Sequence, residues 1–365
     1  MGLRCGIVGL PNVGKSTLFN ALSNAKAESA NYPFCTIEPN VGVITVPDER
    51  LQVLEELVHP ERVLPTVMEF VDIAGLVKGA SKGEGLGNKF LANIREVDAI
   101  IHVVRCFDDP NIVHVAGGVD PVFDKDVIDT ELQIKDLESI DKKIAKVERT
   151  AKSGDAKAKK EFESLKRFKE HLQSGKNARS LDYTPEDLES VEDLQLLTIK
   201  PVIYVANVDE DSIQTGNKFL EALKEHVKDE KAQVVVISAA IEAQIADFTE
   251  PEEKEMFLSE YGLKESGLNQ LIRASYALLD LITYFTAGPK EVRAWTIRKG
   301  WKAPQAAGVI HTDFEKGFIR AEVIKLKDYT EYKTEAKIKE AGKMALEGKD
   351  YVVQDGDIMH FRFNV

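Results

Sequence analysis

The strongest chemical signal in the sequence is a glycine-rich loop at residues 9–16, Gly-Leu-Pro-Asn-Val-Gly-Lys-Ser, which matches the phosphate-binding pattern GxxxxGK[ST]. It stands between an apolar run at 3–9, typical of a buried strand, and a helical pattern that continues to about residue 23. The N–H groups of such a loop and the positive end of the helix bind phosphate. Lys15 is expected to reach the β- and γ-phosphates and Ser16 to coordinate Mg²⁺. The predicted nucleotide contacts in this segment are Asn12, Val13, Gly14, Lys15, Ser16 and Thr17.

A second motif, Asp72-Ile-Ala-Gly75, directly follows a β-rich run at 67–72. Its carboxylate would hold Mg²⁺ through water, and the Gly75 amide would sense the γ-phosphate during hydrolysis. Thr36 lies between the two motifs and is predicted to complete the Mg²⁺ site, although Ser29 and Thr45 are nearby alternatives. The sequence therefore predicts a metal site made by side chains from three separate segments.

The base-reading segment departs from the guanine pattern. GTPases read guanine with NKxD, whereas this chain has Asn-Val-Asp-Glu at 207–210, and Ser-Ala-Ala at 238–240 in place of Ser-Ala-Lys. Glu210 is one methylene longer than aspartate, and a misplaced carboxylate loses the paired hydrogen bonds that give discrimination. We expect relaxed base choice or a preference for ATP, with a degraded but functional guanine site as the alternative. The predicted base contacts are Asn207, Val208, Ser238, Ala239 and Ala240.

The group that positions the attacking water is less obvious. Many GTPases place a glutamine directly after DxxG, but Leu76 stands there and can neither donate nor accept a hydrogen bond. His114, on the loop after the apolar run 99–106, is one candidate, because an imidazole can hydrogen-bond water near neutral pH. Asn12 is another, through a bound K⁺ that spreads transition-state charge. The predicted catalytic groups are His114, Lys15 and Gly75.

The surrounding elements alternate between strands and helices. Apolar or β-rich runs at 3–9, 41–46, 67–72, 99–106, 201–206 and 233–238 are separated by helical patterns such as 216–228. This order predicts a doubly wound α/β sheet. The segment from about 129 to 197 lacks a strand signal and carries apolar residues at three- and four-residue steps, which is typical of an amphipathic or coiled-coil hairpin.

Charge is unevenly distributed along the 365 residues. The formal net charge is −13, yet residues 142–179 contain 13 Lys/Arg and 5 Asp/Glu, so this segment carries +8 and the remainder −21. A basic arm on an acidic body predicts RNA contact confined to the arm. Three widely spaced cysteines and no long apolar run favour a reduced cytoplasmic protein without a membrane span.

A further module follows a closing helix expected at 267–282. Its β-type runs are expected at 294–298, 308–311, 318–324 and 357–363, with a helix at 335–343. Arg298, Lys299 and Lys302 surround Trp301 and offer a second RNA surface, unless Trp301 packs in a turn or core. The predicted domains are a G domain at 1–128 and 200–282, the helical insertion at 129–199 and a mixed β/α domain at 283–365.

Several segments together resemble the Obg-like ATPase family, YchF group, within the TRAFAC P-loop class. They are the loop at 9–16, Asn-Tyr-Pro-Phe-Cys-Thr-Ile-Glu-Pro-Asn at 31–40, Asp-Ile-Ala-Gly-Leu at 72–76, Asn-Val-Asp-Glu at 207–210, and residues 294–365, which are similar to a TGS module. The resemblance implies a G domain, a coiled-coil insertion and a TGS domain. It also implies ATP hydrolysis in preference to GTP, association with the ribosome, and a histidine at position 114 that assists hydrolysis.

The leading functional hypothesis is a slow Mg²⁺-dependent ATPase switch whose basic arms bind RNA of the ribosome, including its large subunit. A GTPase switch and a nucleotide-gated RNA- or protein-binding module with negligible hydrolysis stay open as alternatives. K⁺ is a second candidate cofactor, and a monomer is expected.

Overall fold

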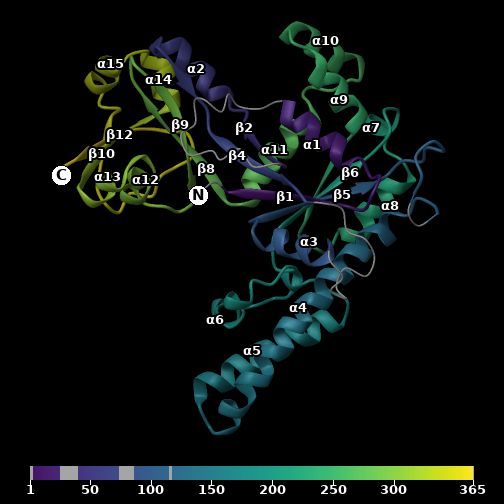
Figure 1. Ribbon diagram of the computed structural model, residues 1–365. Helices are drawn as coiled ribbons and strands as arrows, with labels where there is room; N and C mark the ends of the chain where they lie inside the picture. Colours follow the sequence, from purple (N-terminus) through teal and green to yellow (C-terminus); the bar gives the residue numbers. More distant parts are fainter. Residues whose placement is uncertain (1–2, 25–39, 74–85, 115–116, 365) are drawn as a thin grey trace. The chain divides into compact units, whose positions relative to one another are not determined.

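The computed structural model describes residues 3–24, 40–73, 86–114 and 117–364 (Figure 1). Thr36, Gly75 and Leu76 lie outside these ranges, so the predictions made for them stay predictions. The chain divides into two compact units. The first holds residues 69–271 together with the N-terminal strand and helix, and the second holds residues 43–68 and 272–364, within the described ranges.

The first unit is built on a six-stranded sheet in the order β2-β4-β1-β5-β6-β7, in which β4, β1, β5, β6 and β7 pair in parallel. This arrangement confirms the predicted doubly wound α/β fold. β5 and β6 are buried along their whole length, because helices cover both faces of a parallel sheet. In order across the sheet the strands are β2 (Val41–Thr45), β4 (Val67–Asp72), β1 (Arg4–Val8), β5 (Ala99–Arg105), β6 (Val202–Asn207) and β7 (Gln233–Ile237).

The helices of this unit follow the predicted alternation with the strands. α1 packs against α9, while α4 packs against β5 and α8. The helices are α1 (Lys15–Asn24), α3 (Leu86–Arg95), α4 (Pro121–Lys152), α5 (Ala156–Gln173), α6 (Pro185–Glu189), α7 (Ser212–Thr215), α8 (Lys218–Val227), α9 (Ala239–Asp247), α10 (Pro251–Glu260) and the start of α11 (Gly267–Leu278), whose residues from 272 onward belong to the second unit. There are 3₁₀ turns at Ala178–Ser180 and Glu192–Leu194.

α4 and α5 form the predicted helical hairpin between β5 and β6, and Figure 1 shows them side by side. Their apolar stripes meet in a core around Ile140, Leu165 and Phe168. α4 begins at Pro121, eight residues before the expected start at 129, because Asp120 caps it by accepting hydrogen bonds from the Val122 and Phe123 N–H groups. Gly154, with φ of +98°, makes the turn at the hairpin tip.

The second unit contains a mixed sheet in the order β11-β10-β12-β8-β9-β3. One face packs against α2 and α14 around Phe285 and Ile358, and the other against α12 around Tyr284 and Met359. The elements are α2 (Glu49–Val58), β3 (Val63–Leu64), β8 (Leu281–Ala287), β9 (Val292–Arg298), α12 (Ala303–Ile310), α13 (Thr312–Lys316), β10 (Phe318–Lys325), α14 (Leu326–Tyr332), α15 (Glu335–Glu340), β11 (Ala345–Glu347) and β12 (Asp357–Phe363).

Two local expectations for the C-terminal module were wrong. Residues 308–311 do not form a strand, since α12 continues to Ile310; the preceding Ala-Pro-Gln-Ala-Ala run forms a helix with proline in its first turn. The closing helix stops at Leu278 rather than 282, and β8 starts at Leu281 after Asp280, which has φ of +52°. The predicted domain boundaries themselves stay predictions.

Candidate functional site

The glycine-rich loop joins β1 to α1 at the carboxyl end of the parallel sheet. Gly14 has φ of +92°, and a Cβ there would collide with the Asn207 amide, so the loop needs glycine at this position. The Leu18 N–H donates to Gly14 O at 3.0 Å and begins the helical turn. Ser16 and Thr17 are exposed at the start of α1, where helix N–H groups attract anions.

Lys15 and Asp72 form an ion pair at the head of this loop. The pairing follows from the topology, because β4 runs parallel to β1 with Asp72 in register with Ile7. Lys15 is buried, whereas Ser16 is exposed one residue later. A hydroxyl and a carboxylate are oxygen donors that suit Mg²⁺, which takes most of its remaining ligands from water and substrate phosphate. The described residues contain no cluster of His, Cys, Asp or Glu that would bind a metal by itself.

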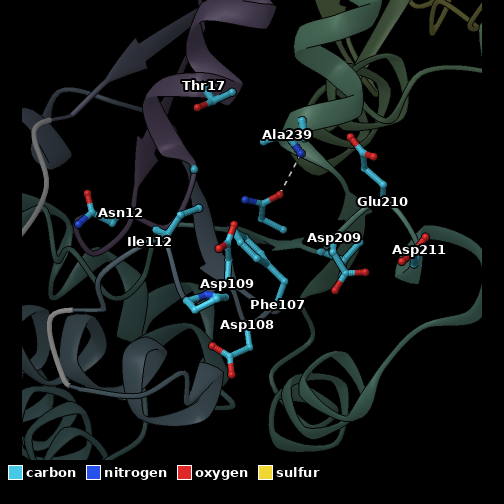
Figure 2. A pocket seen from close by; sticks show the side chains of 15 residues that line it. Asn12, Thr17, Phe107, Asp108, Asp109, Ile112, Asp209, Glu210, Asp211 and Ala239 are labelled. Atoms are coloured by element: carbon cyan, nitrogen blue, oxygen red, sulfur yellow. Dashed lines mark hydrogen bonds between the residues drawn. The ribbon is translucent and has the colours of Figure 1, made fainter.

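A pocket of about 580 Å³ opens beside the loop (Figure 2). Its walls come from the phosphate loop, the loop after β5, the loop after β6 and the start of α9. All the sequence-predicted base contacts except Ser238 line it; Ser238 is buried and caps α9 through the Ile241 N–H. The lining residues are Asn12, Gly14, Thr17, Phe107, Asp108, Asp109, Pro110, Ile112, Asn207, Val208, Asp209, Glu210, Asp211, Ala239 and Ala240.

Asn207 ties three parts of this pocket together. Its Nδ2 donates to Val13 O at 2.9 Å, and its Oδ1 accepts from the Ala239 N–H at 2.9 Å. Figure 2 shows the second of these bonds at the start of α9. The amide thus holds the phosphate loop against the strand end and helix start that form the base side. The predicted contact of Asn207 with the adenine edge stays a prediction.

The side chains at the base-reading positions are held by their neighbours. Val208 is only 2% exposed, and Gln244 Nε2 donates to Glu210 Oε1 at 2.9 Å. Glu210 is therefore already engaged by a side chain of α9. Gln244 was not identified from the sequence, and nothing in its local pattern distinguishes it from any polar residue on a helix.

The loop after β5 is organised by Arg105, a fully buried residue. Its guanidinium donates to the carbonyls of Phe107, Asp109 and Ile112 at 3.0, 3.3 and 3.0 Å. The phosphate-loop residue Asn12 also reaches this loop, since its Nδ2 donates to Val113 O at 3.1 Å. A charged residue inside an apolar strand was the available sequence signal for Arg105.

His114 is turned towards the first helix of the hairpin. Its Nε2 lies 2.8 Å from Asp124 Oδ2, and the two side chains are 4% and 3% exposed. Burial raises the pKa of Asp124, although the hydrogen bond from His114 opposes the shift. Burial and the charge of Asp124 raise the pKa of the Cys106 thiol to about 12. Asp124 was not identified from the sequence.

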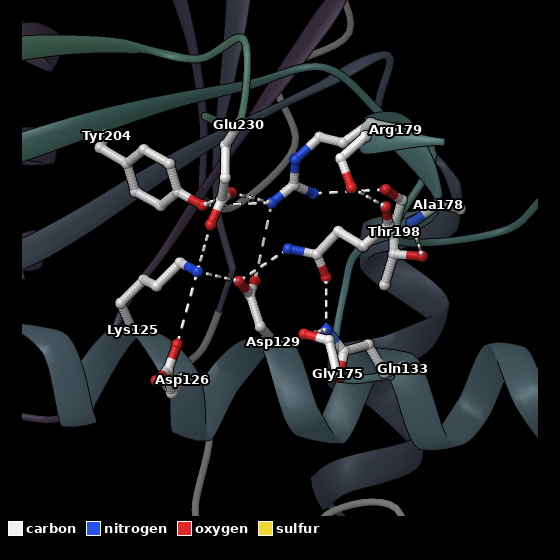
Figure 3. Close-up of polar contacts among 12 residues, drawn as sticks. Lys125, Asp126, Asp129, Gln133, Gly175, Ala178, Arg179, Thr198, Tyr204 and Glu230 are labelled. Atoms are coloured by element: carbon white, nitrogen blue, oxygen red, sulfur yellow. Dashed lines mark hydrogen bonds and ion pairs between the residues drawn. The ribbon is translucent and has the colours of Figure 1, made fainter. Parts of the chain in front are cut away.

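The root of the hairpin is fixed to the sheet by buried charges (Figure 3). Lys125 pairs with Asp129 at 2.9 Å and also with Glu230, while Arg179 lies 3.2 Å from Glu230. Burial opposes ionisation of Asp129, but Arg179 and Lys125 hold its pKa below the ordinary value. Tyr204 of β6 donates to Glu230 at 2.7 Å. The first turns of α4 are thereby joined to the central strands.

Glu242 is a buried carboxyl group near the start of α9. Glu242 is 2% exposed and accepts the Gly267 N–H at 2.7 Å at the start of α11. Its other oxygen is buried and accepts no hydrogen bond from the described residues. Burial raises the pKa of Glu242 to about 7, against the two backbone N–H groups that lower it.

The basic segment forms an exposed cationic surface on α5. Four lysines, named here the tip lysines, are exposed, and the described acidic side chains form no ion pair with them. Arg167 differs, because it binds Asp187 at 2.5 Å and Asp182 O at 2.7 Å and so supports the fold. The tip lysines are Lys157, Lys159, Lys160 and Lys166.

Trp301, the aromatic residue considered as an RNA contact in the second unit, is less exposed than the tip lysines. Trp301 is partly buried against the core on the α12 side of the sheet, whereas Arg298 and Lys299 are exposed and Lys302 pairs with Asp350 at 2.7 Å. Within the described residues, no helix is both long enough and apolar enough to cross a membrane.

Comparisons with known proteins match both ends of the chain. Residues 4–152 match the family described as 50S ribosome-binding GTPase, and residues 281–364 match YchF-GTPase_C, described as a protein of unknown function (DUF933). The "Ribosome-binding ATPase YchF" of Bacillus subtilis is 59% identical over 367 residues, and that of Escherichia coli O157:H7 is 57% identical over 365; each match covers 100% of both chains. The solved structure of the Schizosaccharomyces pombe YchF GTPase is 42% identical, with a TM-score of 0.90, and the match covers 99% of this chain and 98% of that one.

Proposed function

Because the chain belongs to the YchF family, we propose that it binds ATP at the glycine-rich loop and hydrolyses it to ADP and phosphate as a slow switch that associates with the ribosome. The observation that carries the proposal is the Lys15–Asp72 pair at the head of the loop, beside a pocket of about 580 Å³. On ATP binding, the phosphate groups would replace Asp72 as the partner of Lys15. The carboxylate of Asp72 would then be free to hold Mg²⁺ through water.

Mg²⁺ is the proposed cofactor, and Ser16, Asp72 and Thr36 are the proposed protein groups around it. When bound, the ion would neutralise charge on the β- and γ-phosphates. Lys15 would contact the same phosphates and the Gly75 amide would sense the γ-phosphate. His114 is the proposed water-positioning group, with Asn12 and K⁺ as the second candidate.

ATP preference is supported by the state of the base-reading carboxylate. In a guanine site the corresponding aspartate must be free to accept two hydrogen bonds from the base, but Glu210 already accepts one from Gln244. Losing such a pair costs several orders of magnitude in discrimination. The alternative, a GTPase switch, draws support from the matched family and the S. pombe relative, both of which are named as GTPases.

Ribosome association is proposed through the tip lysines, with the exposed Arg298 and Lys299 as a second surface. The curated relatives carry ribosome-binding names, and the tip lysines stand on a chain whose formal net charge is −13. Contact with rRNA would neutralise phosphates and release counterions. A cytoplasmic monomer is the proposed working form.

Isothermal titration with Mg-ATP and Mg-GTP tests the nucleotide assignment. Tighter binding of ATP supports it, equal binding indicates relaxed base choice, and tighter binding of GTP favours the alternative. A nucleotide-gated module with negligible hydrolysis would bind ATP but release no phosphate in a single turnover.

A further inference from the structure

Glu210 stands at the position from which a guanine site reads the base, and its carboxylate is held by α9. Gln244 Nε2 donates to Glu210 Oε1 at 2.9 Å, and Figure 2 shows Glu210 on the α9 side of the pocket. Gln244 is exposed, so water competes with this hydrogen bond, and the bond alone would hold the carboxylate weakly. A lasting orientation of Glu210 therefore needs a second contact.

Tyr261 supplies the second contact from the end of α10. Desolvation and the negative charge of Glu210 are the main causes that raise the pKa of Tyr261, and a hydrogen bond to the same carboxylate adds to them. The phenol therefore stays protonated at neutral pH and can act as the donor in this bond. Glu210 is thus held from two sides, by an amide of α9 and by a hydroxyl that follows α10.

Tyr261 is itself fixed to the segment that carries Glu210. Gln214 Nε2 donates to Tyr261 O at 3.0 Å and to Gly262 O at 2.9 Å. Because Gln214 lies in α7, four residues after Glu210, these bonds connect the end of α10 to the base-reading segment. Gly262, with φ of +65°, ends the helix directly after Tyr261. The Tyr261 ring packs against Phe257, with 5.1 Å between the ring centroids, so its hydroxyl has a defined direction.

Holding this carboxylate affects the two bases differently. Guanine presents two donors, N1–H and N2–H, to a carboxylate at this position, whereas adenine presents the N1 acceptor, which a carboxylate repels. A carboxylate turned towards α9 and α10 deprives GTP of two hydrogen bonds and spares ATP a repulsive contact. Discrimination of this kind depends on withholding partners from the wrong ligand as much as on contacts to the right one.

We propose that Gln244 and Tyr261 are specificity-determining residues, which together hold the Glu210 carboxylate away from the base and so exclude GTP. The inference rests on the proposed preference for ATP and names the groups that enforce it. Both residues act through Glu210 and are positioning residues. The exclusion of GTP would then depend on side chains outside the base-reading motif itself.

A double-mutant cycle in isothermal titration with Mg-ATP and Mg-GTP tests the proposal. Gln244→Ala combined with Tyr261→Phe is expected to raise the affinity for GTP relative to ATP by roughly five- to 20-fold, because each lost hydrogen bond frees the carboxylate further. The same pair of changes in a Glu210→Ala background should leave the ratio unchanged, since the carboxylate through which they act is gone. The matched control makes the same two types of change on the hairpin, Gln173→Ala with Tyr183→Phe, and should keep the wild-type ratio.

The outcomes distinguish this inference from the proposed function. A wild type that prefers ATP, with an unchanged ratio in the Gln244→Ala, Tyr261→Phe variant, rejects the two residues and leaves the ATP preference standing. An equal rise in the Glu210→Ala background also rejects them, because the effect would not pass through Glu210. If thermal melting shows that the double variant does not fold, Gln244→Ala alone decides, with a rise of roughly two- to fivefold supporting the proposal and no rise overturning it. A wild type that binds GTP as tightly as ATP, or more tightly, contradicts the proposed preference and the inference together.

Discussion

Reversal of the tip lysines to glutamate tests whether the hairpin contacts ribosomal RNA. These four side chains are exposed and make no ion pair with described residues, so their replacement should leave the hairpin core intact. Arg167 is left unchanged in this variant, because it binds Asp187. The hydrogen bond from Arg167, together with others to the same carboxylate, lowers the pKa of Asp187 to about 2 against the effect of burial. Its reversal would disturb the hairpin as well as its surface.

The expected effect follows from counterion release. Each phosphate contact contributes about 0.7 to 0.9 to the slope of log K against log salt, so four contacts account for a slope of about 3 to 4. Wild-type association should therefore lose roughly 50- to 150-fold more affinity than the variant between about 50 and about 200 mM potassium. Cosedimentation with ribosomes over this range measures the difference.

A matched control reverses four lysines elsewhere on the first unit that form no ion pair with described residues, Lys218, Lys231, Lys254 and Lys264. Both variants shift the formal net charge from −13 to −21, so a general charge effect would weaken them equally. We expect the control to retain a wild-type salt slope and both variants to retain ATP affinity. Wild-type cosedimentation of the tip variant at every salt concentration would refute the hairpin surface and leave Arg298 and Lys299 as the candidates.

Three further predictions concern the nucleotide site and the unit that carries it. Lys15→Ala and Ser16→Ala should each weaken Mg-ATP binding about tenfold or more, since a charge-assisted contact is worth roughly 1.5–3 kcal/mol. Both variants should stay folded, and only Lys15→Ala, which leaves Asp72 without its ion-pair partner, is expected to lower the melting temperature; titration and thermal melting check this. Val208→Lys with Glu210→Asp restores NKxD and should raise GTP affinity relative to ATP, and an unchanged ratio in calorimetry would reject the role given to Glu210 in base choice. Because the folded pKa of Glu242 is about 7 against an ordinary 4.5, its contribution to stability is greatest below pH 4.5 and is lost as pH rises through about 7. Glu242→Gln should remove this decline, worth roughly 2–3 kcal/mol, and urea unfolding at about pH 5 and about pH 8 measures it.

Much of the fold was predictable because its signals are local. The apolar runs that became β5 and β6 need no partner to be recognised, and the three- and four-residue steps of α4 and α5 define a hairpin by themselves. The prediction of a strand at residues 308–311 was wrong because a short apolar segment fits either a strand or a helix. Only the contacts of α12 with the sheet decide between the two.

The candidate site was predictable where one segment carries the chemistry. The glycine-rich loop is such a segment, whereas Asp124 and Gln244 act on residues 10 and 34 positions away. Such pairs form only when the chain has folded, so spacing gives no signal for them. Arg105 could have been suspected, because a fully buried guanidinium needs several acceptors.

Single-turnover hydrolysis of Mg-ATP and Mg-GTP by the wild-type protein and Lys15→Ala tests the central claim most directly. Excess protein over labelled nucleotide removes product release from the measurement. We predict faster phosphate release from ATP than from GTP in the wild type, and loss of both in Lys15→Ala. Equal ATP hydrolysis by wild type and Lys15→Ala, or faster hydrolysis of GTP than of ATP, would contradict the claim.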